Sequence, residues 1–250
     1  MRLVVLTAYF FFSLNQVALA DKVLVAVASN ALKALQSVKK EFEKDTGHKL
    51  QISSGSTGKL YAQIVNGAPY DVFLAANVRE PEKLENTGFI VNGSRFTYAR
   101  GKLALCSTTL ELDEVKAKQL LTSGKFNRLA LASPRTAPYG AAAKQVLEKL
   151  SAWKQNKRKF IKGENISQAY QFTASGNVEL GFVALAQTWK NKISPFKTCW
   201  DVPESYYSPL EQQAVWLKRG KNNPVAKEFV DYLKSGKVKN IFSNDFGYGT

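Results

Sequence analysis

Short β-rich segments alternate with amphipathic helical segments along most of this chain, and the alternation restricts its fold more than any other feature. Residues 22–28 form a β-rich run, and apolar residues then recur every three or four positions over 32–42, as on one face of a helix, before Gly47 ends it. The same succession recurs further on. The other predicted strands are 50–53, 70–76, 102–107, 129–133, 178–183 and 212–217, and the other predicted helices are 59–66, 140–153, 224–234 and one that opens at 165–167.

Strands that alternate with helices of about ten residues indicate parallel βαβ units, so the sequence predicts an α/β fold. The roughly 230 residues after position 20 could form one large domain or two lobes, because a single core stops growing at about 250–300 residues. Hydrophobic residues make up 45% of the chain, which is enough to bury a substantial core and excludes a disordered protein.

The first 20 residues have the features of a secretory signal peptide. Arg2 precedes an apolar run over 3–12, and the sequence Ala-Leu-Ala at 18–20 is a small-x-small cleavage site. The alternative is an uncleaved anchor, but the apolar run is short for a membrane span and polar residues follow it at 15 and 16. We therefore expect cleavage after Ala20 and export to the periplasm.

Basic residues exceed acidic ones by 35 to 20, which gives a formal net charge of +15. Lysines such as Lys33, Lys39 and Lys44 are spread over predicted helix faces, so we interpret the excess as a solvated basic surface that attracts anions. A nucleic-acid binder is the alternative. It is disfavoured because the tyrosines and phenylalanines have core-like spacing and form no aromatic platform among the lysines.

The sequence contains two cysteines, Cys106 and Cys199, and a single histidine, His48. An exported chain meets an oxidising compartment, so one disulfide could form, but the sequence does not show whether the two cysteines are close enough. Zinc, haem and histidine-based catalysis are poorly supported. Without a Gly-x-Ser-x-Gly motif, a secreted α/β hydrolase is a weak alternative, and we expect that the protein is not an enzyme.

Four predicted junctions between a strand and a helix have the composition of an anion site. Ligands of open α/β sheets bind beyond the carboxyl ends of the strands, where the first N–H groups of the helices are free. Each junction alone reads as an ordinary helix cap. Two lie in each half of the chain and none has a charged side chain, which favours one shared site. The junctions are 28–30, 55–58, 138–140 and 165–167.

The helix termini also indicate the charge of the ligand. Each N-terminus carries about half a unit of positive charge, so four would present about two units, which matches a dianion without any lysine or arginine. A fully deprotonated oxyanion only accepts hydrogen bonds, and a site made of donors suits it. These properties favour molybdate, tungstate or sulfate over a phosphate that keeps a proton.

Several segments carry a resemblance to a known family. The most specific are 25–30, 54–64, 67–76 and 96–103, and looser matches are 134–140, 181–183 and 242–248. Over essentially the whole mature chain, the sequence resembles the periplasmic molybdate-binding proteins of ABC transporters.

The resemblance implies the type II periplasmic-binding-protein fold, an α/β fold of two lobes, each a mixed, mostly parallel sheet flanked by helices. It also implies that the chain crosses between the lobes near 102–107 and near 212–217. We therefore expect the first lobe to comprise 21–103 and 213–250, and the second lobe to comprise 104–212.

The resemblance further implies an oxyanion held by hydroxyl and backbone N–H groups without a counter-charge. The residues that match are Ser29, Asn30 and Thr57 in the first lobe, and Tyr139 and Ile166 in the second. For Tyr139 and Ile166 the resemblance implies binding by the backbone N–H, with a side chain that only packs. The metal of the oxyanion is contacted through its oxygens alone, with no direct protein ligand, and no cofactor is expected.

One position departs from the family. Some relatives place a ligand tyrosine shortly after the strand that corresponds to 181–183, and Ala184 stands there in this chain. Either Asn30 supplies the missing donor, or the pocket and its anion differ. The resemblance implies a monomeric receptor that delivers molybdate, and tungstate, to the membrane permease of an ABC transporter and binds no nucleic acid; a sulfate-type receptor is the alternative.

Overall fold

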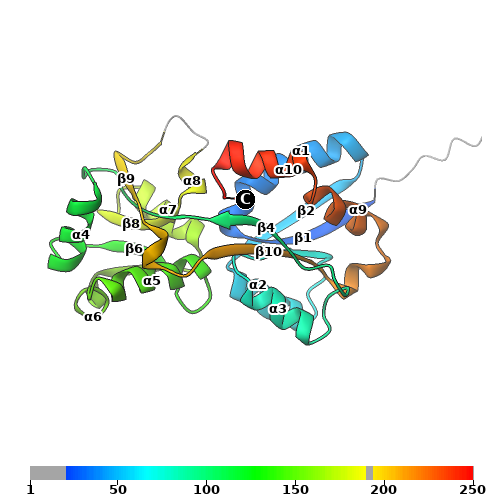
Figure 1. The fold of residues 1–250 in the computed structure, drawn as a ribbon, viewed down its shortest axis with the longest axis horizontal. Helices are drawn as coiled ribbons and strands as arrows, with labels where there is room; N and C mark the ends of the chain where they lie inside the picture. Colours follow the sequence, from blue (N-terminus) through cyan, green and yellow to red (C-terminus); the bar gives the residue numbers. More distant parts are fainter. Residues whose placement is uncertain (1–20, 190–193, 250) are drawn as a thin grey trace, which may run out of the picture.

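The computed structural model describes residues 21–189 and 194–249, so the predicted signal peptide lies outside the described residues. Two five-stranded sheets stand side by side, and each is flanked by helices (Figure 1). The predicted two-lobed α/β fold is therefore confirmed. Within the described part of the chain, no helix has the length and apolar character needed to cross a membrane.

The first sheet lies in the lobe that contains the beginning and the end of the described chain (Figure 1). Its strand order is β2 (Lys49–Gly55), β1 (Lys22–Ala28), β3 (Val72–Leu74), β10 (Leu210–Trp216) and β4 (Phe96–Gly101). Its helices are α1 (Leu32–Thr46), α2 (Thr57–Val65), α3 (Arg79–Asn86), α9 (Pro224–Leu233) and α10 (Gly236–Asn240). Phe42 of α1 packs edge-on against Phe229 of α9 in the core of this lobe.

The second sheet is built in the same way. Its strand order is β7 (Phe160–Gly163), β6 (Leu129–Ala132), β8 (Leu180–Ala184), β5 (Leu103–Ser107) and β9 (Thr198–Asp201). Its helices are α4 (Glu114–Ser123), α5 (Pro138–Lys149), α6 (Trp153–Asn156), α7 (Ile166–Ala174) and α8 (Ala186–Trp189).

Two connections join the sheets. Lys102 alone separates β4 from β5, and residues 202–209 lead from β9 back to β10. The expectation of mixed, mostly parallel sheets is confirmed, since four of the five strands of each sheet run in the same direction. The fifth strand, β10 in the first sheet and β5 in the second, enters from the other lobe without a βαβ connection and runs antiparallel to both of its neighbours.

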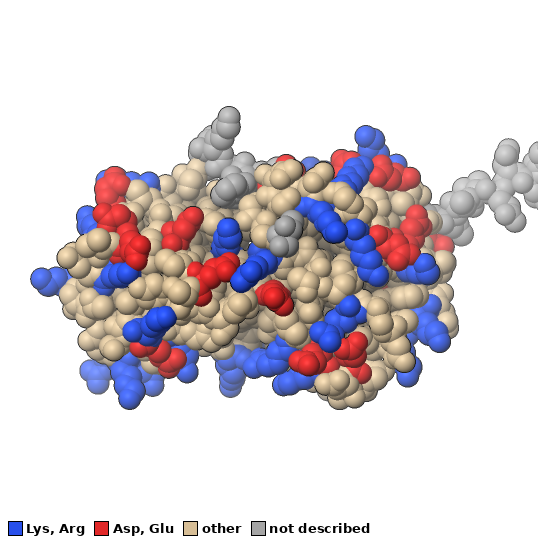
Figure 2. All heavy atoms as spheres, viewed as in Figure 1, with Lys and Arg blue, Asp and Glu red and all other residues tan. Residues whose placement is uncertain are grey.

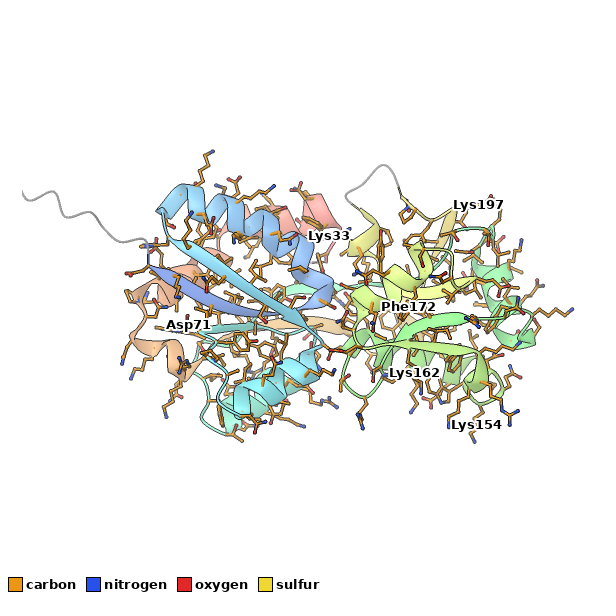
Figure 3. All side chains as sticks on the ribbon, turned by 180° about the vertical axis from the view of Figure 1, so that it is seen from behind. Lys33, Asp71, Lys154, Lys162, Phe172 and Lys197 are labelled. Atoms are coloured by element: carbon orange, nitrogen blue, oxygen red, sulfur yellow. A yellow bond between two sulfur atoms is a disulfide. The ribbon has the colours of Figure 1, made fainter. Side chains whose placement is uncertain are left out.

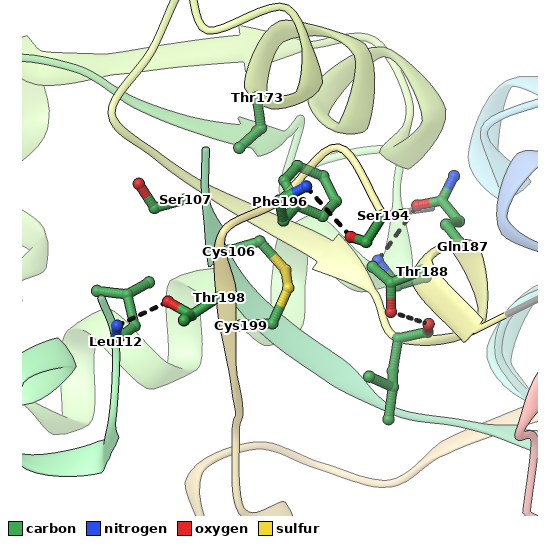
Figure 4. Close-up of a disulfide and its surroundings, with 12 residues drawn as sticks. Cys106, Ser107, Leu112, Thr173, Gln187, Thr188, Ser194, Phe196, Thr198 and Cys199 are labelled. Carbon is green, nitrogen blue, oxygen red and sulfur yellow. Dashed lines mark hydrogen bonds between the residues drawn. A yellow bond between two sulfur atoms is a disulfide. The ribbon is translucent and has the colours of Figure 1, made fainter. Parts of the chain in front are cut away.

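Cys106 and Cys199 form a disulfide within the second lobe (Figure 4). The two residues are direct partners in the antiparallel pair of β5 and β9, with 4.1 Å between their Cα atoms. The bond therefore ties β9, an edge strand, to the interior of the sheet. The sequence left this pairing open, because the register of β5 and β9 brings together residues 93 positions apart.

Candidate functional site

The four junctions meet at one small cavity between the lobes, and all five predicted site residues lie around it. The space between its lining atoms is about 180 Å³, against about 1470 Å³ for the groove beside Lys33 and Gln187, so it suits a small solute. The lining residues are Ala28, Ser29, Asn30, Gly55, Ser56, Thr57, Ala76, Ala137, Pro138, Tyr139, Asn165 and Ile166.

The cavity is surrounded by the first turns of helices. Ser29 opens a short 3-10 turn that continues into α1, Thr57 begins α2, Pro138 begins α5, and Ile166 begins α7. The first N–H groups of a helix have no partner within it, and they carry the positive end of the helix dipole. None of the residues that line the cavity has a charged side chain. The site is thus electropositive through backbone groups alone.

Two adjacent hydroxyls at the start of α2 face this cavity. Thr57 Oγ1 accepts a hydrogen bond from the N–H of Ala76 at 3.1 Å, which orients the hydroxyl and leaves its proton free to donate. Ser56 is 2% exposed, and its Oγ has no partner among the described residues. Ser56 stands at the N-cap of α2 yet does not cap it. Ser56 lies within the predicted junction 55–58, but the sequence alone indicated no role for it.

The side chain of Asn30 is turned away from an anion in the cavity. Asn30 Nδ2 donates to Gln212 Oε1 at 2.8 Å and to the Tyr248 hydroxyl at 3.1 Å, so both of its hydrogens are used. The Tyr248 hydroxyl donates back to the carbonyl of Asn30 at 3.0 Å. What Asn30 can offer an anion is the backbone N–H at the start of its helix.

Ala184 lies outside the cavity lining, in β8. Its N–H donates to Gln187 Oε1 at 3.2 Å, and Gln187 Nε2 donates to Ser167 Oγ at 3.0 Å. Ser167 Oγ in turn donates to the carbonyl of Ser29 at 3.0 Å. A relay of hydrogen bonds thus runs from Ala184 to the backbone of the first lobe.

Tyr139 and Ile166 differ in what their side chains do. Ile166 is 3% exposed and belongs to the core of the second lobe, as expected of a side chain that only packs. The same expectation is wrong for Tyr139, because its buried hydroxyl accepts a hydrogen bond from Gln212 Nε2 at 3.1 Å. Burial raises the pKa of Tyr139 far above the usual value of a tyrosine, so the hydroxyl keeps its proton.

Direct contacts hold the lobes together around the cavity. The N–H of Gly58 donates to the carbonyl of Thr136 at 2.9 Å, and Lys59 pairs with Glu164 at 2.9 Å. A Cβ atom on Gly58 would lie 3.1 Å from that carbonyl oxygen, so glycine permits the close approach. Lys33 of α1 lies at the junction of the lobes, 5.3 Å from the ring centre of Tyr170 (Figure 3). The two lobes are therefore in direct contact beside the cavity.

The surface charge does not concentrate in one stripe on the face drawn in Figure 2, where acidic side chains lie among the basic ones on both lobes. Several lysines pair with an acid one helical turn away, such as Lys144 with Glu148 and Lys227 with Asp231. Such exposed pairs contribute little to stability. Their distribution fits a solvated basic surface that attracts small anions.

Two α/β lobes, joined by two crossings and closed over a small uncharged site, define a ligand-capturing binding protein. The family model described as bacterial extracellular solute-binding protein matches residues 23–249, and the chain belongs to this family.

Individual relatives agree with this assignment. The chain is 49% identical to the molybdate-binding protein ModA of Azotobacter vinelandii, over 92% of this chain and 90% of the relative, and 39% identical to ModA of Rhodobacter capsulatus, over 93% and 90%. Among solved structures, the periplasmic molybdate-binding protein of Azotobacter vinelandii superimposes with a TM-score of 0.85 at 40% identity, over 91% of this chain and 99% of that one. The predicted resemblance is therefore confirmed.

A more distant structure shares the fold alone. The sulfate-binding protein SubI of Mycobacterium tuberculosis superimposes with a TM-score of 0.71 at 10% identity, over 91% of this chain and 86% of that one.

Proposed function

We propose that this protein is a periplasmic receptor that binds molybdate, and tungstate, between its lobes and delivers the anion to the permease of an ABC transporter. One observation carries the proposal: uncharged hydrogen-bond donors from helix N-termini of both lobes surround a single small cavity. Because β5 begins at Leu103 in the second sheet and β10 begins at Leu210 in the first, we move the expected bounds slightly and assign residues 21–102 and 210–249 to the first lobe and residues 103–209 to the second. The receptor acts as a monomer.

The proposed ligands are donors only. Three are hydroxyls and three are backbone N–H groups at helix starts, which suits a dianion without a proton because nothing in the lining would repel it. The proposed hydroxyl donors are those of Ser29, Ser56 and Thr57, and the proposed N–H donors are those of Asn30, Tyr139 and Ile166.

Selection between anions follows from size, because molybdate and tungstate have longer bonds to oxygen than sulfate has. A closed cavity with fixed walls matches only one of these sizes well. We therefore expect sulfate to bind more weakly than molybdate, since it cannot contact donors of both lobes at once.

Thermal melts test the function directly. A ligand that binds only the folded state raises its stability by about 4 kcal/mol at a thousand times its Kd, which for a chain of this size is a rise of about 8–16 °C in Tm. We expect this rise with molybdate and tungstate and a smaller one with sulfate or phosphate at equal concentration. No shift with molybdate or tungstate would rule the proposal out.

Replacing Ser56 by alanine tests the site. A hydrogen bond to a charged group contributes about 1.5–3 kcal/mol, so Ser56→Ala should weaken molybdate binding by roughly 10- to 150-fold. The unliganded fold should keep its Tm, because the hydroxyl bonds to none of the described residues. Ser54→Ala is the matched control, since Ser54 is exposed and outside the cavity lining. Equal affinities of the two variants, measured by titration calorimetry, would exclude Ser56 as a ligand.

A further inference from the structure

Gln212 is fully buried and lies in β10, the strand in which the chain returns from the second lobe to the first. Its Oε1 accepts hydrogen bonds from Asn30 Nδ2 and from the Tyr98 hydroxyl, both at 2.8 Å. Its Nε2 donates to the Tyr139 hydroxyl at 3.1 Å. One amide group therefore contacts a residue of the cavity lining from each lobe.

We propose that Gln212 is a positioning residue that fixes the positions of Asn30 and Tyr139 relative to each other across the two lobes. This inference rests on the proposed function. Neither bond reaches the anion itself. Each instead fixes the side chain of a residue that lines the cavity and whose backbone N–H is a proposed ligand. Gln212 thereby sets how far apart the donors of the first and second lobes lie.

Buried polar side chains surround the Gln212 amide. We call Gln212, Asn30, Tyr98, Tyr139 and Tyr248 the Gln212 network. Burial raises the pKa values of its three tyrosines far above the usual value, so their hydroxyls stay protonated. In the observed arrangement Gln212 supplies an acceptor on one side and a donor on the other, which a neutral amide does and an ionised carboxylate does not.

The backbone of Gly101 lies close to the side-chain amide of Gln212. A Cβ atom on Gly101 of β4 would lie 2.1 Å from the Tyr139 hydroxyl and 2.5 Å from Gln212 Nε2. Glycine at position 101 therefore leaves the space that the bond between these two side chains occupies. The pairing of β10 with β4 shifts its register between Gln212 and Gln213, which places these neighbours in different surroundings.

The decisive variant is Gln212→Glu. An ionised carboxylate cannot donate to Tyr139. It also places a negative charge beside Asn30 and Tyr139, which line the cavity proposed to hold the anion. We expect molybdate affinity at pH 8 to fall by about 10- to 100-fold relative to the wild type. Burial raises the pKa of a carboxyl group. As the pH falls towards 5, the group takes up a proton, regains a donor, and the deficit relative to the wild type at the same pH should shrink.

Gln213→Glu is the matched control. Gln213 Oε1 accepts from Arg95 at 2.9 Å and its Nε2 donates to Thr97, so the same substitution one residue on places the charge beside an arginine and away from the cavity. It should leave molybdate affinity unchanged at every pH. Equal and pH-independent losses in the two variants, or no loss in Gln212→Glu, would overturn the proposal.

Tyr139→Phe tests the positioning role of Gln212 if the Gln212→Glu variant fails to fold. This variant keeps the ring and the backbone N–H, and it removes only the oxygen to which Gln212 donates. We expect molybdate binding about 5- to 10-fold weaker and a Tm of the unliganded protein lower by a few degrees, because the buried Gln212 Nε2 loses the partner to which it donates; unchanged affinity would contradict the inference. Failure of the proposed function appears separately, as a wild type that binds no oxyanion.

Discussion

Replacing Ser29 by aspartate is expected to abolish oxyanion binding without harming the fold. The new carboxylate would stand among the lining residues of a cavity proposed to hold a dianion. Two unit charges 4 Å apart repel by about 4 kcal/mol at an effective dielectric of 20, and a dianion doubles this to about 8 kcal/mol. Even a quarter of that figure would weaken binding about 30-fold.

The same substitution should not lower the stability of the unliganded protein. Ser29 opens the turn that leads into α1, and an acidic residue at the start of a helix interacts favourably with its dipole. The Tm of the unliganded variant should therefore match or exceed that of the wild type. Calorimetric titration with molybdate and thermal melts of the unliganded protein together measure both effects.

Ser29→Asn is the matched control, because asparagine has nearly the size of aspartate but no charge. It should retain measurable binding where aspartate has none. Were Ser29→Asp to bind molybdate like the wild type, the anion could not lie at this junction, and the proposed ligand set would be wrong.

Local sequence patterns were sufficient to predict where the candidate site lies. In an α/β fold, strands end and helices begin at one edge of the sheet, so a Ser, Thr or Asn at such a junction can be placed without knowing the rest of the structure. Ser29, Thr57 and Ile166 stand at the starts of the helical segments that were predicted, and all three line the cavity.

Strands and side-chain contacts whose partners lie far away in the sequence could not be predicted from local patterns. β4, β7 and β9 were not predicted as strands. An edge strand tolerates a lysine such as Lys162, because one side of it faces solvent. The partners of Gln212 lie 182, 114 and 73 positions away in the sequence. Its role follows from how the two lobes meet, which no local window of sequence contains.

Loss of the disulfide is expected to have the largest effect on stability. The bond between Cys106 and Cys199 links residues 93 positions apart, and a crosslink of this length restricts the unfolded chain by about 4–5 kcal/mol in the chain-entropy model. It also fastens β9, whose only neighbour in the sheet is β5. We expect the Cys106→Ala, Cys199→Ala double variant to lose about 3–5 kcal/mol of unfolding free energy, or roughly 6–20 °C in Tm.

Urea unfolding of the oxidised wild type, the reduced wild type and the double variant would measure this loss. Cys106 is fully buried, so the wild type must be reduced while unfolded and then refolded. The reduced wild type and the double variant should unfold at the same low urea concentration, and reducing agent should leave the variant unchanged. Because neither cysteine lines the cavity, the refolded variant should bind molybdate within about twofold of the wild type, as for independent sites. A reduced protein as stable as the oxidised one would show that the strand pairing of β5 and β9 holds this edge of the sheet without the covalent bond.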